Sequence, residues 1–191
     1  TSDGFFFAAK GGHNAESHNH NDLGTCVLYI NGEPCLVDIG RETYTMKTFS
    51  SRRYEIWTMQ SQYHQLPKIN GVDQMQGREY HAENSTFSAD ENKAVFSTDI
   101  AGAYPEEASV EKWVRTYRLD RGEKFTVSDN YKLSEVSDKP TTLNFVTSCK
   151  VTQLNDDTML LEGKGFVLQM KFDDRKFTPE IDFNEVTDSK L

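Results

Sequence analysis

The chain has 191 residues, of which 36% are hydrophobic and 27% are charged, and its formal net charge is −9. This composition is typical of a globular protein, and the length suits one domain over residues 1–191 with a sizeable core. The acidic balance argues against nucleic acid as a partner, and the sequence lacks the run of about eighteen apolar residues that a helical membrane span needs.

The first clear element along the chain is a β-hairpin. Two apolar runs, TCVLYI and CLVDIG, flank Asn31-Gly32, a dipeptide that strongly favours a two-residue hairpin turn. Cys26 and Cys35 lie within these runs. They could pair across the hairpin, but their apolar neighbours favour packing as small hydrophobic residues. With Cys149 the count is odd, so the sequence predicts no complete disulfide framework.

The segment 49–64 has no clean alternation and could contain a helical turn, whereas residues 69–88 carry turn signals and return to strand. Further along the chain, apolar and polar residues alternate with period two between turn residues. The strands predicted there cover residues 111–119, 124–133, 141–154, 158–163 and 165–172. This pattern predicts an all-β protein, an antiparallel β-sandwich of the super-sandwich type with few or no helices.

The segment GGHNAESHNHND is rich in histidine and contains a His-x-His pair, His18 and His20. On an extended strand alternate side chains share a face, so both imidazoles could reach one cavity, with Asp22 on the same face. Imidazole and carboxylate are the usual ligands of zinc and similar divalent ions. The pair therefore marks a candidate metal site that needs at least one more ligand from elsewhere in the fold.

Two residues are the best candidates to complete the site. Asp38 ends an otherwise apolar run, and a carboxylate there must be hydrogen-bonded, paired or metal-bound if it is buried. The hairpin turn brings Asp38 back toward His20. His64, in SQYHQLP, is the second candidate. Spacing alone leaves a metal site and an ordinary polar loop as open alternatives.

Other residues near this segment suit substrate binding. If His20 binds a metal, His18 is held beside it and could act as an acid or base or stabilise an anion. Tyr44 and Tyr54 could stack on sugar rings or pack into the core. The nearby basic side chains could recognise carboxylate or sulfate, or could be solvated surface charge; they are Arg41, Lys47, Arg52 and Arg53.

Together, the segments GGHNAESHNHNDLGTCVLYINGEPCLVDIGRETYT and FSSRRYEIWTMQSQYHQLP resemble the β-sheet domain of heparinase II/III-like polysaccharide lyases. The resemblance is close over residues 5–75 and looser through AYPEEASVEKWVRTYRL. It rests on the combination of the His-x-His-x-Asp-x-Gly start, the Asn-Gly hairpin, the Val-Asp-x-Gly ending and the later Tyr-His pair. One position departs from the pattern, because Gln65 stands where many relatives have asparagine.

The resemblance implies a larger enzyme. Complete members of the family have an N-terminal α/α toroid followed by antiparallel sheets, and they cleave uronic-acid polysaccharides such as alginate or glycosaminoglycans by β-elimination. We therefore expect this chain to be the C-terminal part of a periplasmic or secreted lyase, with the polysaccharide and its own toroid as partners. Because the family's proton-abstracting tyrosine lies on the toroid, the isolated chain is expected to be inactive.

The resemblance also assigns roles to residues. It implies that His18 is the catalytic histidine near the uronate carboxylate, and that His20, Asp38 and His64 bind a structural zinc ion. The expected substrate-binding residues are His13, Asn14, Arg53 and Tyr54.

Two other classes of protein fit parts of the sequence. A carbohydrate-binding β-sandwich with a structural metal would share the aromatic content and the acidic surface. A cupin-type metal enzyme would share the spacing of Gly12 from the His-x-His pair. However, Gly24 and Thr25 stand where the cupin motif needs glutamate.

Overall fold

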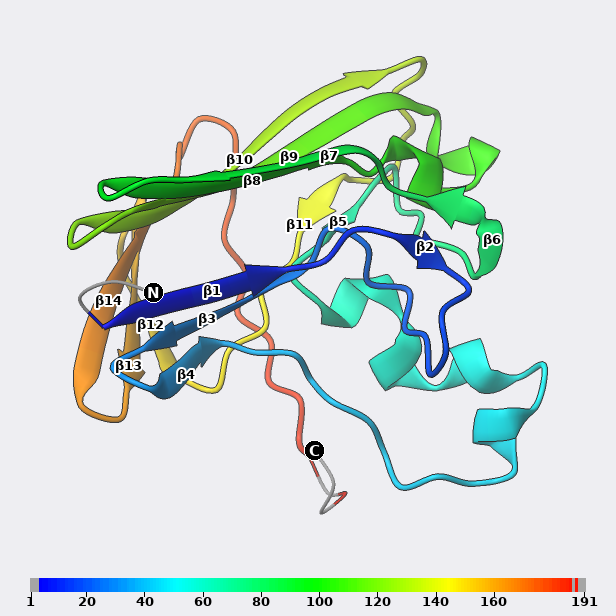
Figure 1. Ribbon diagram of the computed structural model, residues 1–191, viewed down its shortest axis with the longest axis horizontal. Coiled ribbons are helices and arrows are strands. Elements are labelled where there is room, and N and C mark those ends of the chain that lie inside the picture. The colour runs from blue at the N-terminus through cyan, green and yellow to red at the C-terminus, as the bar shows by residue number, and fades with distance from the viewer. Residues whose placement is uncertain (1–3, 187, 189–191) are drawn as a thin grey trace.

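The computed structural model describes residues 4–186 and 188, and antiparallel β-strands dominate it (Figure 1). The strands are β1 Phe5–Ala9, β2 His13–Asn14, β3 Cys26–Ile30, β4 Glu33–Leu36, β5 Pro67–Lys68, β6 Gly77–His81, β7 Glu83–Ala89, β8 Lys93–Asp99, β9 Val110–Asp120, β10 Lys124–Leu133, β11 Thr142–Leu143, β12 Lys150–Asn155, β13 Thr158–Gly163 and β14 Phe166–Lys171. Short 3-10 helices connect some of them, namely η1 Lys47–Phe49, η2 Arg53–Glu55, η3 Trp57–Met59, η4 Ser61–Tyr63, η5 Ala101–Ala103 and η6 Glu106–Ala108.

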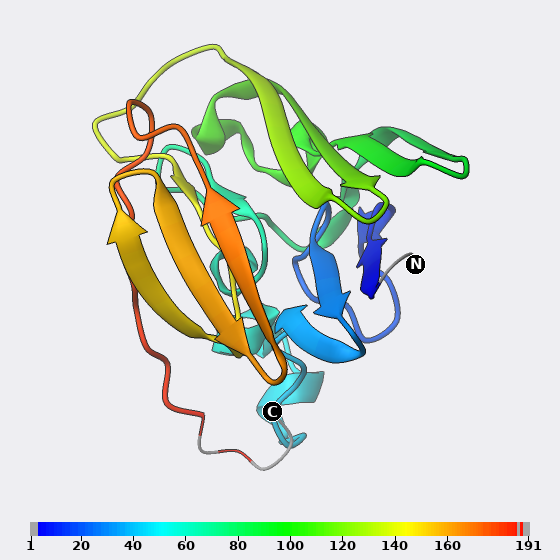
Figure 2. The ribbon, with the colours of Figure 1, turned by 90° about the vertical axis from the view of Figure 1, so that its left-hand side faces the viewer.

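The strands form layers. The largest sheet has the order β10-β9-β8-β7, and it lies over a second sheet with the order β1-β3-β4 (Figure 1). A third sheet, β12-β13-β14, closes one end of these layers (Figure 2). The pairs β2–β6 and β5–β11 are short ladders; β2 and β6 lie on the side opposite the third sheet, and β5 and β11 lie between (Figure 1). The predicted all-β antiparallel sandwich is confirmed. No helix in the described part of the chain is long and apolar enough to cross a membrane.

The predicted hairpin is present as β3 and β4. Ile30 pairs with Glu33 across a two-residue turn, so that Asn31 and Gly32 occupy the two central positions. Their φ angles are 54° and 83°. Because both angles are positive, the turn needs residues that tolerate the left-handed region, which asparagine and glycine do.

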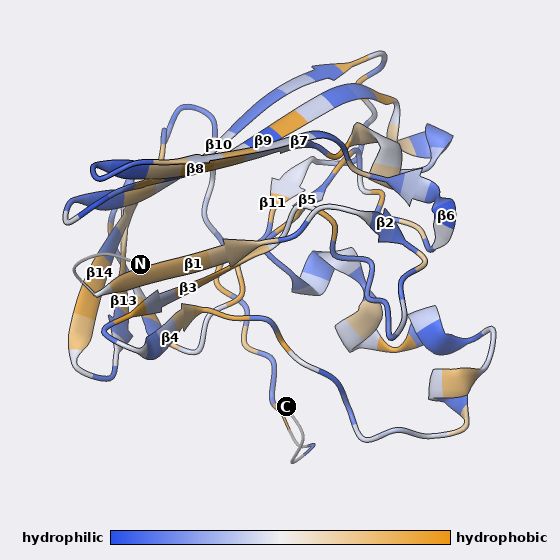
Figure 3. Cartoon of the chain, viewed as in Figure 1, coloured by the Kyte–Doolittle hydropathy of each residue, from blue (hydrophilic) through white to orange (hydrophobic). Residues whose placement is uncertain are grey.

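Two buried clusters make the core, and β9 contributes to both. Its alternation holds as predicted, since Trp113, Arg115, Tyr117 and Leu119 are all buried. Tyr117 packs in the cluster between the β1-β3-β4 sheet and the β12-β13-β14 sheet, whereas Trp113 packs in the cluster around Leu66. In Figure 3 hydrophobic residues colour most of β1 and parts of β14, whereas the turn between β7 and β8 is hydrophilic.

Two segments depart from regular strand structure. Residues 47–63 contain the helices η1 to η4, each a single turn, which confirms the helical turn expected in this region. The strand predicted over residues 141–154 is broken, because β11 ends at Leu143 and β12 begins at Lys150. Between them the chain runs beside β4, where Thr147 forms an antiparallel bridge with Leu36.

A buried ion pair connects β9 to β10. Arg115, fully buried, donates to both carboxylate oxygens of Asp129 at 2.8 and 2.7 Å. The indole N–H of Trp113 donates to the same carboxylate at 2.7 Å. Arg115 also donates to the backbone carbonyl of Gln65. This arrangement satisfies a buried guanidinium and anchors the segment that follows His64.

Replacing Asp129 by asparagine should destabilise the protein by about 3–5 kcal/mol, because it leaves the buried Arg115 charge uncompensated. Glu111→Gln is the matched control, since Glu111 pairs with Lys132 across the same two strands but both side chains are largely exposed. The control should cost about 1 kcal/mol or less. Denaturant unfolding measures both changes, and equal losses would contradict the role given to the buried pair.

Candidate functional site

A cavity of about 320 Å³ lies where the end of β1, the histidine-rich loop and the segment after β4 meet. It brings together three of the residues predicted to form the site, His18, His20 and Asp38. The full lining consists of Lys10, His18, His20, Asp22, Asp38, Gly40 and Arg41. Both signs of charge therefore face one small space.

The histidine-rich segment reaches this cavity as a loop. The expectation of an extended strand through His18 and His20 is wrong, because residues 15–25 form turns and irregular structure. The backbone N–H of Asn19 donates to the carbonyl of Glu16 at 3.2 Å, and His18 has a φ of 60°. Histidine enters this left-handed region more readily than most residues. A turn, and not strand alternation, points both imidazoles into one cavity.

Arg53 and Tyr54 both form hydrogen bonds with Asn19 of this loop. Arg53 donates from Nε and a terminal nitrogen to the carbonyl of Asn19, the residue between the two histidines, at 3.2 and 3.0 Å. Its other terminal nitrogen donates to the carbonyl of Thr48 at 3.1 Å. The side-chain amide of Asn19 donates to the hydroxyl of Tyr54 at 3.4 Å. Both residues thus lie next to the candidate site, but neither is part of the cavity lining.

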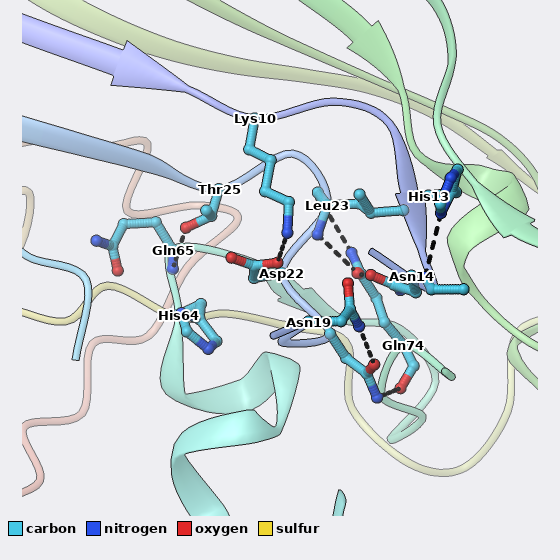
Figure 4. A network of polar contacts seen from close by, with 12 residues as sticks. Lys10, His13, Asn14, Asn19, Asp22, Leu23, Thr25, His64, Gln65 and Gln74 are labelled. Atoms are coloured by element: carbon cyan, nitrogen blue, oxygen red, sulfur yellow. Dashed lines mark hydrogen bonds and ion pairs between the residues drawn. The ribbon is translucent and has the colours of Figure 1, made fainter. Parts of the chain in front are cut away.

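Three residues form a possible metal-binding group. The ligand atoms of Asp22, Asp38 and His64 all lie within 4.8 Å of one another. His64 is buried beside Asp22 (Figure 4), and its Nε2 lies 3.2 Å from the carbonyl of Thr58. An N–H donated to that carbonyl leaves Nδ1 free to coordinate, which is the usual arrangement of a metal-binding histidine. One imidazole and two carboxylates suit zinc or a similar divalent ion.

His20 lies beside this group. Its ring centroid is 5.6 Å from that of His64. Burial, and then the neighbouring His64, lower the pKa of His20 below its ordinary value, although Asp22 and Asp38 act in the opposite direction. Its ring is therefore neutral at neutral pH, the form that can coordinate a metal. The predicted ligands His20, Asp38 and His64 are thus close together in the structure.

Asp22 was not among the predicted ligands. The sequence placed it on the face of the two histidines, but its burial and its distance to His64 depend on contacts between remote segments. Its carboxylate already has a partner, since the Nζ of Lys10 lies 2.5 Å from Oδ1 (Figure 4). Asp38, in contrast, is exposed and accepts the backbone N–H of Gly40 at 2.7 Å.

His18 stands at the exposed side of the cavity against an aromatic side chain. The hydroxyl of Tyr44 lies 3.3 Å from its Nδ1, and the two rings are parallel within 1° at a centroid distance of 6.3 Å. The guanidinium of Arg41 lies 4.1 Å from the centre of the Tyr44 ring. Phe49 meets the same ring edge-on. These contacts orient the imidazole and place a cation beside it.

His13 and Asn14 lie apart from the cavity lining, on β2. His13 pairs with His81 of β6, and its Nδ1 accepts the backbone N–H of Ala15 at 3.2 Å. Asn14 is fully buried, and its amide donates to Gln74 Oε1 at 3.2 Å and to the carbonyl of Met75 at 2.9 Å. A role for either residue in substrate binding stays a prediction.

Comparison with known proteins agrees with this architecture. The family model described as heparinase II/III-like, C-terminal, matches residues 5–187. A solved structure of a heparinase III with methylated lysines superposes with a TM-score of 0.64 at 16% sequence identity, which supports the fold. The match covers 84% of this chain and 25% of that chain, so this protein spans about a quarter of the heparinase III chain. No curated protein matched the sequence. Because the family model spans nearly the whole chain, this protein belongs to the heparinase II/III-like C-terminal family.

Proposed function

We propose that this chain is the sheet-domain part of a polysaccharide lyase that cleaves uronic-acid-containing polysaccharides by β-elimination. One observation supports it most directly. A single cavity combines an exposed, oriented histidine, His18, and a cation, Arg41, with the carboxylates of a possible metal-binding group. The family match provides the lyase context.

The chemistry of β-elimination explains why these residues suit the reaction. A base removes the proton α to the uronate carboxylate, the electron pair forms a carbon–carbon double bond, and the glycosidic oxygen leaves with a proton. Negative charge builds on the carboxylate in the transition state. A positioned imidazole and guanidinium stabilise that charge, so we assign this role to His18 with Arg41 beside it.

The base belongs to a different part of the proposed enzyme. In this assignment the tyrosine that removes the proton lies on an N-terminal α/α toroid, and the polysaccharide binds between the toroid and this domain. The proposed substrate-side residues remain His13, Asn14, Arg53 and Tyr54. Arg53 and Tyr54 would act indirectly, because they hold Asn19 in place. The proposed location is periplasmic or secreted.

For the metal we propose a structural zinc held by His20, Asp38 and His64. Bound zinc would supply a fixed positive charge next to His18. Asp22 lies within reach of the same ion, but its pairing with Lys10 gives it a separate partner. The features that fit such an ion are the Asp38 carboxylate and the His64 ring, whose Nε2 lies against the carbonyl of Thr58.

The net charge of the chain bears on the class of polysaccharide that it would bind. Net charge −9 opposes the long-range approach of a densely sulfated chain, so a uronate polymer with less charge, such as alginate, suits this domain better than a heavily sulfated glycosaminoglycan. A carbohydrate-binding β-sandwich is the remaining alternative function. The cupin alternative loses its support because the chain belongs to another family.

In the full-length protein, His18→Asn should lower kcat by about 10²–10³-fold, the usual effect of removing one donor to a developing negative charge. Asparagine tolerates the positive φ of this position, so the melting temperature should change little. His81→Gln, outside the cavity, is the control and should keep full activity. Absorbance of the unsaturated product measures turnover. Unchanged turnover by a folded His18→Asn variant would contradict the catalytic role of His18, and a wild type that releases no unsaturated product would favour the carbohydrate-binding alternative.

Removing a proposed ligand should remove the metal. His20→Ala and His64→Ala should each lower the zinc content of the purified protein well below one equivalent and lower its melting temperature, because metal binding contributes to folding stability. Asp22→Asn should keep the zinc. Elemental analysis and melting with and without a chelator test this assignment. If zinc were lost from Asp22→Asn and kept by His20→Ala, Asp22 and not His20 would be the third ligand. If the wild-type protein contained no metal and melted identically with and without chelator, the zinc site would be excluded.

The isolated 191-residue chain should release no unsaturated product from alginate or heparan sulfate, because the proposed base lies on the toroid. The same measurement on the full-length protein is the positive control. Turnover by the isolated chain would contradict the assignment of the base to another domain.

A further inference from the structure

Two cysteines that are far apart in sequence face the same core cluster. Cys35 on β4 is fully buried, and Cys149, just before β12, is half-buried against the same cluster. The sequence suggested Cys26 as the cysteine that could pair with Cys35. The structure places Cys149 beside Cys35, since the Sγ of Cys149 lies 4.0 Å from the carbonyl oxygen of Cys35.

Hydrogen bonds join the chain segments that carry the two cysteines. The N–H of Val37 donates to the carbonyl of Val146 at 3.1 Å, and the hydroxyl of Thr147 donates to the carbonyl of Cys35 at 2.5 Å. The same hydroxyl accepts the N–H of Cys149 at 3.0 Å across a bend. That bend turns Cys149 toward β4, so that its Sγ lies 4.0 Å from the carbonyl oxygen of Cys35.

Both cysteines pack in the same apolar cluster, so their thiols lie near each other. Burial, and then the nearby Cys149, raise the pKa of the Cys35 thiol to about 12. A buried thiol of this kind is a poor nucleophile in its own right. Cys149 is more exposed, so it is the sulfur that an external oxidant meets first.

We propose that Cys35 and Cys149 form an oxidisable pair that closes to a disulfide between β4 and the segment 144–149. The oxidant is a low-molecular-weight disulfide such as oxidised glutathione. The Cys149 thiolate attacks one of its sulfurs, forms a mixed disulfide and releases one glutathione thiolate. Cys35 then loses its proton and attacks the Cys149 sulfur. This attack forms the protein disulfide and releases the second glutathione thiolate. Two protein thiols and one glutathione disulfide thus become one protein disulfide and two glutathione thiols.

The cross-link would stabilise a part of the fold that supports the candidate site. It joins residues 114 positions apart, so it would restrict the unfolded chain strongly. It also fixes the strand that leads through Val37 to Asp38. The inference does not depend on the proposed lyase activity, because it rests on the contacts of the two cysteines alone.

Peptide mapping of the purified protein after incubation with oxidised glutathione tests the pairing. Trypsin leaves Cys26 and Cys35 on one peptide, residues 11–41, and Cys149 on another, residues 133–150, because Lys139 precedes proline. Under non-reducing conditions the two peptides should be joined, and dithiothreitol should separate them. The disulfide between the two peptides should persist in Cys26→Ala and disappear in Cys149→Ala. The melting temperature of oxidised Cys26→Ala should fall by roughly 5 °C or more when the disulfide is reduced.

Cys149→Ala is the matched control for stability, since its melting temperature should not respond to reduction. If this variant does not fold, Cys149→Ser at the same half-buried position replaces it. Separate peptides after oxidation of the wild type would overturn the proposal. A join that is lost in Cys26→Ala would overturn it as well, since it would show that Cys26 is the partner of Cys149.

Discussion

Gln65 is buried, and its side-chain amide bonds to three backbone segments that are far apart in sequence. Its nitrogen donates to the carbonyls of Cys26 and Val37 at 3.0 and 2.7 Å, and its oxygen accepts the N–H of Val146 at 3.1 Å. Its own carbonyl accepts a hydrogen bond from the buried Arg115. A buried amide that lost these partners would leave several polar groups unsatisfied, so the segments are held at fixed spacing.

This spacing determines the geometry of the candidate site. His64 directly precedes Gln65, and Asp38 directly follows Val37, so one amide sets the distance between two members of the possible metal-binding group. Asparagine, which the family resemblance leads one to expect here, is one methylene shorter. The glutamine reaches both carbonyls from the position it occupies. The connection through Arg115 to Asp129 extends the same support into the largest sheet, so the site depends on the core and not on its loops alone.

Local rules predicted the elements that local chemistry determines. The turn at Asn31-Gly32 and the buried face of β9 follow from backbone preference and alternation, and both are present. The left-handed turn at His18 depends on the contacts that Arg53 makes with the loop from elsewhere in the fold, which alternation does not encode.

The burial of single polar residues and their long-range partners also could not be predicted from a sequence pattern. Asn14 looks like an exposed polar residue in a glycine-rich segment, but the structure buries it against Gln74 and Met75. Asp22 lies only two positions from His20, yet its distance to His64 depends on where residues 47–63 pack, and that segment has no periodicity. Sequence reasoning therefore brought histidine and carboxylate side chains to the same region, but it did not identify which carboxylates lie closest to His64.

The charges inside the cavity differ from those of the whole chain. Among its lining residues the carboxylates of Asp22 and Asp38 face the cations Lys10 and Arg41, so the two signs balance there although the chain carries −9. Charges more than about 8–10 Å away are largely screened at physiological salt, so in the proposed lyase a bound uronate would be affected mainly by the charges that line the cavity and less by the overall surface. In the proposed arrangement a divalent cation would compensate Asp38, while Lys10 pairs with Asp22. Arg41 would then remain available to an anion. In the proposed lyase, a metal with a purely structural position would thus still set the charge that the substrate carboxylate meets.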